Sequence, residues 1–279
     1  IGTDSLYVDD SGTTIGYTSA QINDAAGGYV LGRTTTLLNF GAAAPIRYEY
    51  DPSGSRLENL YIRTSSGADT ISVNATTADY TEIDLGPGDD ASTAYINGDA
   101  LSGDNVFVGN TGVDRFVLDV TTDLGATAIT PVSSLRIEGN DPGGDSSARD
   151  ILEIVDLGAV ARNLDFGFQS GGGLLVSGLA VPVDVRTMET VNYQGSGGND
   201  DAISVTGTSG DDLITVAPTD YHSALVFLGG DPWDGPAVDG DFFDQFPGVA
   251  GGGLAPDLAI SGVANLYVDP AGGSANRVY

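Results

Sequence analysis

The sequence predicts an all-β protein, and three observations carry this prediction. Strand- and turn-favouring residues such as Gly, Asp, Thr, Ser and Val dominate the 279-residue chain, whereas helix formers are scarce, with six Glu, one Met and no Lys. A short motif that places Asp before alternating apolar residues recurs along the chain, and turns rich in Gly and Asp separate its copies. We expect a parallel β-solenoid (β-helix), with antiparallel β-sandwich modules as the alternative.

The recurring motif reads Asp, any residue, apolar residue, any residue, apolar residue. Because successive side chains of a strand point to opposite faces, this alternation predicts strands with one buried face. Copies begin at Asp4, Asp69, Asp104, Asp114, Asp150, Asp201 and Asp212. Related runs without the leading Asp are 60–62, 83–85, 135–137 and 266–268, and residues 34–40 also indicate a strand.

Glycine- and aspartate-rich turns precede most copies of the motif. Gly supplies the positive-φ positions of a tight turn, and Asp or Asn hydrogen-bonds the turn backbone. Such turns occupy 65–69, 109–114, 195–201 and 207–212.

The spacing of the copies favours a solenoid. Asp104 and Asp114 are ten residues apart, and Asp201 and Asp212 are eleven apart. Short strands at such intervals are typical of a sandwich, a barrel or a solenoid. Degenerate recurrence of similar units favours stacked coils of roughly 20–36 residues, each burying its apolar face on the next.

The chain divides into two parts. Residues 1–55 form a less regular β segment, which we interpret as a cap or docking surface, and residues 56–279 form the repeat-bearing solenoid. The first 63 residues hold four of the ten basic residues, all arginine, and only seven of the 39 acidic ones. This part is therefore the least repelled docking surface for a second acidic copy of the chain.

The two ends of the sequence resemble each other. Leu6-Tyr-Val8-Asp9 matches Leu266-Tyr-Val268-Asp269. When the last strand of a chain resembles its first, the last strand of one molecule can pair with the first strand of the next and so continue the same sheet. The candidate contact strands are residues 4–9 and 264–269.

Composition excludes several classes of protein. A net charge of −29 argues against nucleic-acid binding, because phosphates would be repelled. No stretch approaches 18 consecutive apolar residues, which argues against insertion into a membrane. The absence of cysteine excludes disulfides, thiolate metal sites and a thiol nucleophile.

We expect the chain to lie outside the cell. Because the sequence begins at Ile1 without an initiator Met, we expect a processed chain or a segment of a longer one. The acidity and the lack of cysteine favour an extracellular or cell-surface location, and a halophilic cytoplasm is the alternative.

Two segments resemble the calcium-binding nonapeptide of RTX (haemolysin-type) proteins, Gly-Gly-x-Gly-x-Asp-x-apolar-x. They are Ser65-Ser-Gly67-Ala-Asp69-Thr-Ile71-Ser and Thr208-Ser-Gly210-Asp211-Asp212-Leu-Ile214-Thr. More broadly, residues 188–216 resemble repeats of giant bacterial cell-surface and adhesin proteins. The resemblance implies secretion, arrays of β-solenoids or β-sandwiches, calcium dependence and structural or adhesive roles.

Clustered aspartates are the candidate calcium ligands. Calcium takes six to eight oxygen ligands, and closely spaced carboxylates attract a cation because they otherwise repel one another. The alternative is that these side chains are solvated caps of turns. The candidates are Asp200, Asp201, Asp211, Asp212, Asp231, Asp234, Asp239, Asp241 and Asp244.

The function that we expect is structural and not enzymatic. The chain would be a segment of a cell-surface fibre whose copies join head to tail through edge strands. Alternatives are a calcium-dependent adhesin or carbohydrate-binding module with a surface glycan as partner, and a β-helical carbohydrate-active enzyme. Asp220, His222 and Ser223 lie close in sequence, but no nucleophile elbow accompanies them, so they do not indicate a catalytic triad.

Overall fold

The computed structural model is built almost entirely of β-strands. It describes residues 3–14, 20–24, 34–40, 46–50, 57–87, 92–127, 131–139, 150–169, 173–188, 190–197, 201–207, 213–228, 258–269, 271 and 277–278. Within these residues the helical content is one 3₁₀ turn, η1 (Gly98–Ala100), and no helix is long and apolar enough to cross a membrane. The all-β prediction is confirmed.

One sheet contains ten strands, and most of its neighbouring pairs are parallel. Their spatial order is β1 (Ser5–Asp9), β5 (Asn59–Arg63), β7 (Tyr80–Asp84), β9 (Gly103–Val108), β11 (Val132–Glu138), β15 (Val183–Arg186), β14 (Leu174–Ser177), β13 (Asn163–Phe168), β17 (Ala202–Thr206) and β21 (Asn265–Asp269).

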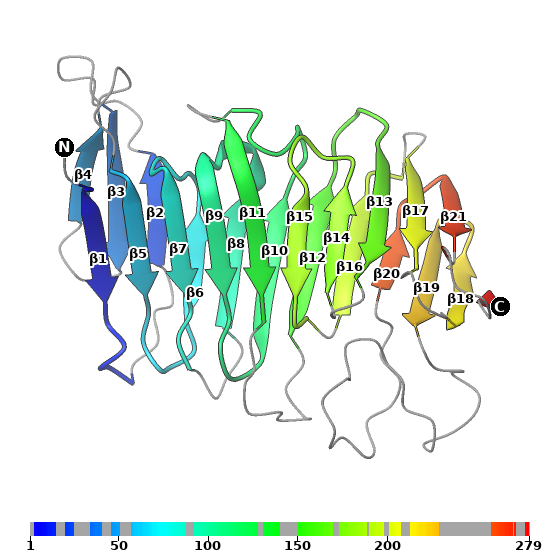
Figure 1. Cartoon of the computed structure of the whole chain (residues 1–279), viewed down its shortest axis with the longest axis horizontal. Coiled ribbons are helices and arrows are strands. Elements are labelled where there is room, and N and C mark those ends of the chain that lie inside the picture. Colours follow the sequence, from blue (N-terminus) through cyan, green and yellow to red (C-terminus); the bar gives the residue numbers. More distant parts are fainter. Residues whose placement is uncertain are drawn as a thin grey trace.

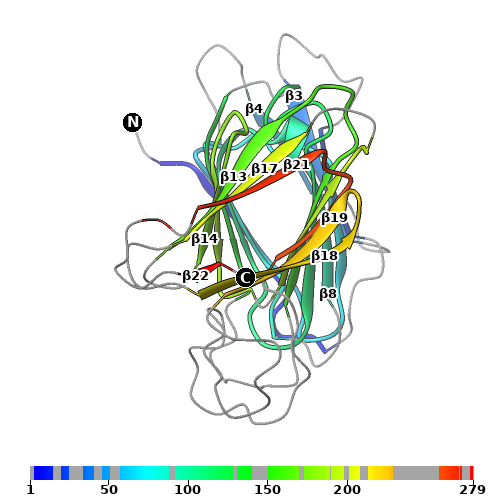
Figure 2. The ribbon, with the colours of Figure 1, turned by 90° about the vertical axis from the view of Figure 1, so that its right-hand side faces the viewer.

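The other sheet contains twelve strands and faces the first. Their order is β22 (Arg277–Val278), β18 (Leu213–Asp220), β19 (Ser223–Leu228), β20 (Leu258–Ser261), β16 (Thr190–Gly195), β12 (Ile151–Asp156), β10 (Asp114–Asp119), β8 (Ser92–Asn97), β6 (Thr70–Val73), β2 (Ala20–Asp24), β3 (Thr34–Phe40) and β4 (Ile46–Tyr50). Figure 2 shows the two sheets as two layers, viewed along the molecule.

From β5 to β12 the chain crosses from one sheet to the other after every strand. Each strand then pairs in parallel with the strand two earlier in the sequence (Figure 1). Leu60 of β5 lies opposite Thr81 of β7, and Ile71 of β6 lies opposite Ala94 of β8, so one circuit takes 21 to 23 residues there. The circuit from Arg115 of β10 to Ile151 of β12 takes 36 residues. This agrees with the circuit length expected from the spacing of the motifs.

Antiparallel strands enter at three places, each as a three-stranded meander. In the ten-stranded sheet, β13–β14–β15 lies between β11 and β17. In the twelve-stranded sheet, β18–β19–β20 lies between β22 and β16. β2–β3–β4 closes the twelve-stranded sheet near the N-terminus.

The core lies between the two sheets and is filled by apolar side chains from one side of the strands whose side chains are described. Buried and half-buried residues alternate along β5, β6, β7 and β12, as the period of two predicts. Phe107, Phe116, Phe166 and Tyr193 are among the largest fully buried side chains. Each such side chain contributes about 1.5–3 kcal/mol by leaving water.

Six of the seven copies of the Asp motif begin at or just before a strand, and the seventh, at Asp104, begins at the second residue of β9. The copy at Asp69 leads into β6, that at Asp114 opens β10, and that at Asp150 leads into β12. The run 34–40 coincides with β3. Within the first 55 residues, the motif identified β1 and the run 34–40 identified β3, whereas no copy of the motif marks β2 or β4.

Candidate functional site

One of the nine candidate calcium ligands, Asp201, falls within the described residues. It immediately precedes β17 and is fully buried. Its Oδ1 accepts the backbone N–H of Arg162 at 2.8 Å, while Oδ2 has no hydrogen-bond partner. Asp201 is therefore not a solvated cap. The other eight candidates lie outside the described residues: Asp200, Asp211, Asp212, Asp231, Asp234, Asp239, Asp241 and Asp244.

The leading aspartates of three other motif copies are buried like Asp201, namely Asp69, Asp114 and Asp150. Asp150 Oδ1 accepts the backbone N–H of Asp114 on the neighbouring strand at 2.8 Å. Asp69 accepts the hydroxyl of Ser65 at 3.1 Å. The carboxylates of Asp150 and Asp201 therefore bind backbone donors of distant segments and hold them together, whereas that of Asp69 binds within its own turn.

Glycine precedes three of these aspartates because their carboxylates occupy the space of a side chain. A Cβ atom built on Gly109, Gly139 or Gly195 would approach Oδ2 of the following motif aspartate to less than 3.0 Å. The Gly-then-Asp pattern of the turns therefore reflects close packing of a carboxylate under the backbone.

A buried ion pair lies where β12 crosses to β13. The guanidinium of Arg162, only 8% exposed, pairs with the fully buried carboxylate of Asp156 at the end of β12. Its Nη1 lies 3.4 Å from Asp123 Oδ1, and its Nη2 donates to the carbonyl of Val120 at 3.1 Å. Burial raises the pKa of Asp156 above its usual value, although Arg162 acts in the opposite direction.

Tyr193 of β16 lies against this ion pair. Its ring packs edge-on against Phe166, with centroids 6.0 Å apart. Its hydroxyl is buried without a well-oriented hydrogen-bond partner. Burial, followed by the charges of Asp156 and Asp201, raises the pKa of the phenol. The cluster is enclosed and has no access for a substrate through Arg162, Asp156 or Tyr193, so we interpret it as structural.

No group of three or more acidic or histidine side chains within the described part of the chain is arranged to hold a metal ion.

His222 lies close in sequence to Asp220 and Ser223, but the hydrogen-bond partner of its ring is a backbone carbonyl of another segment. Its backbone N–H donates to Asp220 Oδ1 at 2.7 Å, and its Nδ1 lies 3.1 Å from the carbonyl of Val263. From the turn between β18 and β19, the ring therefore contacts the backbone between β20 and β21.

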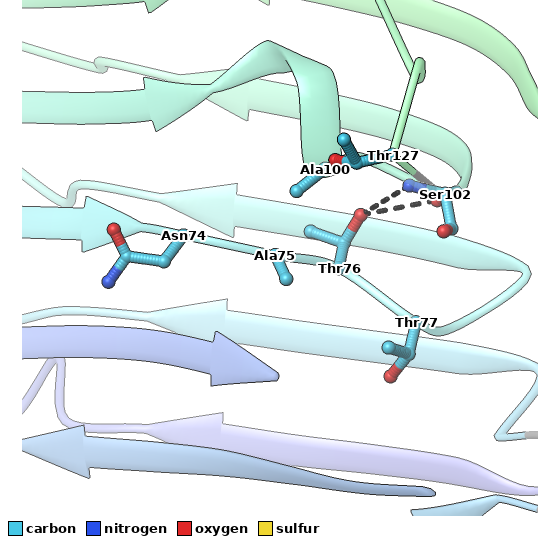
Figure 3. Close-up of a pocket in the computed structure, with 7 residues that line it drawn as sticks. All are labelled: Asn74, Ala75, Thr76, Thr77, Ala100, Ser102 and Thr127. Atoms are coloured by element: carbon cyan, nitrogen blue, oxygen red, sulfur yellow. Dashed lines mark hydrogen bonds between the residues drawn. The ribbon is translucent and has the colours of Figure 1, made fainter. Parts of the chain in front are cut away.

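A polar pocket of about 210 Å³ lies beside the turn that follows β6. Thr76 joins its two sides, because its hydroxyl accepts the Ser102 N–H at 2.9 Å and contacts the Ser102 carbonyl at 3.2 Å (Figure 3). The buried Ser102 hydroxyl has no hydrogen-bond partner. No lining residue is titratable, so the pocket offers hydroxyl and amide groups but no acid or base: Asn74, Ala75, Thr76, Thr77, Ala100, Ser102 and Thr127.

The two ends of the ten-stranded sheet form the most distinctive surface. β1 and β21 are its two edges, and neither pairs with a further described strand. Both contain Leu-Tyr-Val-Asp and share one pattern, with exposed residues alternating with half-buried ones. Both also end in the same turn, since Asp9 Oδ1 accepts the Ser11 N–H and Asp269 Oδ1 accepts the Ala271 N–H, each at 2.9 Å.

The described strands cover the core only partly at these ends. The inward side chains of β1, Leu6 and Val8, are only partly buried, as are Leu266 and Val268 of β21. A hollow of about 170 Å³ lies beside Leu266, between β21 and the β18–β19 turn. An apolar side chain that lacks a neighbouring strand on one side leaves area exposed that a further strand would cover.

Strand direction agrees at the two ends. β1 and β21 each run parallel to their inner neighbours, β5 and β17. In the twelve-stranded sheet, β22 runs parallel to β18, and β4 runs in the direction of β2 because two antiparallel pairings separate them. Figure 1 places β1 and β4 together at one end, and β21 and the C-terminus at the other.

Comparison with known proteins adds no further assignment: no family model, no curated protein and no solved structure matches the chain. Sequence reasoning anticipated the end strands 4–9 and 264–269, which the structure places at opposite edges of one sheet. It missed the Asp156–Arg162 pair. A possible signal was Arg162 itself, because arginines are rare in this chain and this one lies between two strands.

Proposed function

We propose that the chain is a structural module of an extracellular or cell-surface fibre, folded as a parallel β-solenoid and joined head to tail with copies of itself. The solenoid form is supported by the alternation of strands between the sheets and by the parallel pairing of strands one circuit apart. The observation that carries the proposal is the pair of edge strands β1 and β21, which have matching sequence and exposure and do not pair with a further described strand.

The mechanism is addition of strands at open edges. An unpaired edge presents N–H and C=O groups that template another strand. Because the two edges are on opposite ends of the molecule, contact between them is heterologous, and it grows without closing when the copies lie along one axis. Leu6, Val8, Leu266 and Val268 would lose their remaining exposure in such a contact.

Charge opposes this association and makes it dependent on salt. With a net charge of −29, each copy repels the next at low ionic strength, and salt screens that repulsion. The N-terminal part carries the smaller share of this charge, as its residue counts show. We therefore expect assembly to increase with salt concentration as well as with protein concentration.

The test compares purified wild type with two Val→Lys variants by sedimentation velocity and negative-stain electron microscopy. Val8→Lys places a charge on the inward face of an edge strand, and Val160→Lys places the same charge at an exposed turn between β12 and β13. Wild type and Val160→Lys should form linear chains that lengthen with protein and salt concentration. Val8→Lys should remain monomeric.

Dispersed monomers of wild type at every protein and salt concentration, with and without calcium, would contradict the proposal. Chains formed equally well by Val8→Lys would show that assembly uses another surface.

A further inference from the structure

This inference rests on the proposed head-to-tail contact and concerns its register. Tyrosines line the outer face of the ten-stranded sheet at its N-terminal end. The rings of Tyr7 and Tyr61 are stacked, with centroids 4.6 Å apart and planes 4° apart, and Tyr80 lies beside Tyr61 at 5.6 Å. Tyr7 belongs to the edge strand and is 68% exposed, so no described strand lies beside the outer face of its ring.

Tyr267 holds the same position in β21. It is 61% exposed, and its neighbour on β17 is Ser204. Among the described residues, no aromatic ring stacks on it. At one end of the sheet Tyr7 therefore stacks on Tyr61 of the next strand, whereas at the other end Tyr267 stacks on no described ring.

The alternation of side chains restricts the possible registers. A shift by one residue would turn Leu266 and Val268 outward, so only shifts by an even number keep both strands facing the core. With no shift, all five residues of each strand are paired. A shift by two leaves three pairs and places Tyr267 beside Ser5 or Asp9.

From these observations we infer that Tyr267 of one copy stacks on Tyr7 of the next, in the register that pairs Leu266 with Leu6 and Val268 with Val8. Adjacent strands lie about 4.7–4.9 Å apart, and the Tyr7–Tyr61 stack already shows a matching centroid distance of 4.6 Å. The junction therefore continues a row of rings from Tyr267 through Tyr7 to Tyr61.

The same register brings Asp269 beside Asp9. Asp9 lies opposite Arg63 on β5, and Arg63 lies 3.3 Å from Asp84, so the charges alternate inside the molecule. Across the junction two carboxylates are adjacent without an arginine between them. This pair adds a local reason for the expected dependence of assembly on salt.

Introduced cysteines test the register directly, because the chain has none of its own. In the inferred register Ser5 lies opposite Asn265, within the Cα separation of about 4.4–6.8 Å that a disulfide spans. The double variant Ser5→Cys, Asn265→Cys should form covalent ladders on oxidation in non-reducing gels. The control Asp9→Cys, Asn265→Cys should not, because four residues of strand, about 13 Å, separate the two positions. Both variants retain both tyrosines.

The outcomes distinguish this inference from the proposed function. Filaments without ladders from the Ser5–Asn265 pair, or with ladders from the control, would overturn the register and leave the head-to-tail assembly intact. The absence of filaments from wild type would overturn the proposed function itself.

The tyrosine contact has its own measurement. Tyr267→Ala should weaken the junction about 2- to 12-fold in apparent dissociation constant, as the loss of an aromatic pair implies. Tyr267→Phe keeps the ring and should remain within about two-fold of wild type. Equal affinity of the Ala variant and wild type would overturn the stacking of Tyr267 on Tyr7.

Discussion

Strands β17 and β21 are neighbours with the same alternation of side chains, yet their burial differs. Ile203 and Val205 of β17 are fully buried, whereas Leu266 and Val268, which lie directly opposite them, are only partly buried. β17 has a strand on either side, and β21 has a described strand on one side only. The inward side chains of β17 are therefore fully buried because their strand has a neighbour on both sides. The inward side chains of the end strands stay partly exposed.

Alanine substitutions at the two opposed positions measure this difference. Ile203→Ala should lower the free energy of unfolding by about 2–5 kcal/mol, because it leaves a cavity between two strands. Leu266→Ala should cost about 1 kcal/mol in dilute monomer, since much of its side chain already contacts water. Chemical denaturation at low protein and salt concentration provides both values, and equal losses would contradict the comparison.

Two ion pairs, one buried and one on the surface, allow the same comparison of stability between interior and surface. Arg162→Ala leaves the carboxylate of Asp156 buried without its counter-ion and should cost about 3 kcal/mol. Arg115→Ala is the control, because Arg115 pairs at 2.6 Å with Glu153 on the outer face, where both side chains are partly exposed. That variant should cost about 0–1 kcal/mol. Thermal or chemical unfolding would show whether the interior pair matters more.

The smallest expected effect is the pH dependence that comes from Asp156. Because its pKa is raised in the folded state, its contribution to stability is full below its unfolded value near 3.8 and is lost as pH rises through the folded pKa. Wild type should therefore gain stability relative to Asp156→Asn as the pH falls from 7 towards 4. Unfolding measurements on both proteins across this range isolate the effect from that of the other acidic residues. A constant difference between them would show that Asp156 titrates normally.

Local alternation was enough to find most strands but not their partners. The pattern at Asp150 predicts a strand, and β12 follows it, because inward and outward faces are a local property. Which sheet a strand joins depends on the path of the chain across the core, and a period of two does not encode that path. The meander β13–β15 was missed, although Leu164, Phe166 and Phe168 of β13 alternate as the apolar residues of other strands do.

The turn aspartates show the same limit at the level of single residues. Sequence reasoning offered calcium or solvent as partners of Asp201, but the structure gives it the backbone N–H of Arg162, 39 residues earlier. Asp150 likewise binds the N–H of Asp114, 36 residues away. A partner on the adjacent circuit is invisible to a local pattern. The remaining eight calcium candidates stay predictions.

The meanders have a consequence for the shape of the body. The meanders β13–β15 and β18–β20 lie in different layers, and each layer has four described strands beyond β15 or β16. A meander in one layer alone lengthens that layer by two strand spacings, about 10 Å, relative to its partner. The two C-terminal meanders compensate each other in this way, whereas β2–β3–β4 has no counterpart in the ten-stranded sheet, so the twelve-stranded layer has two strands more.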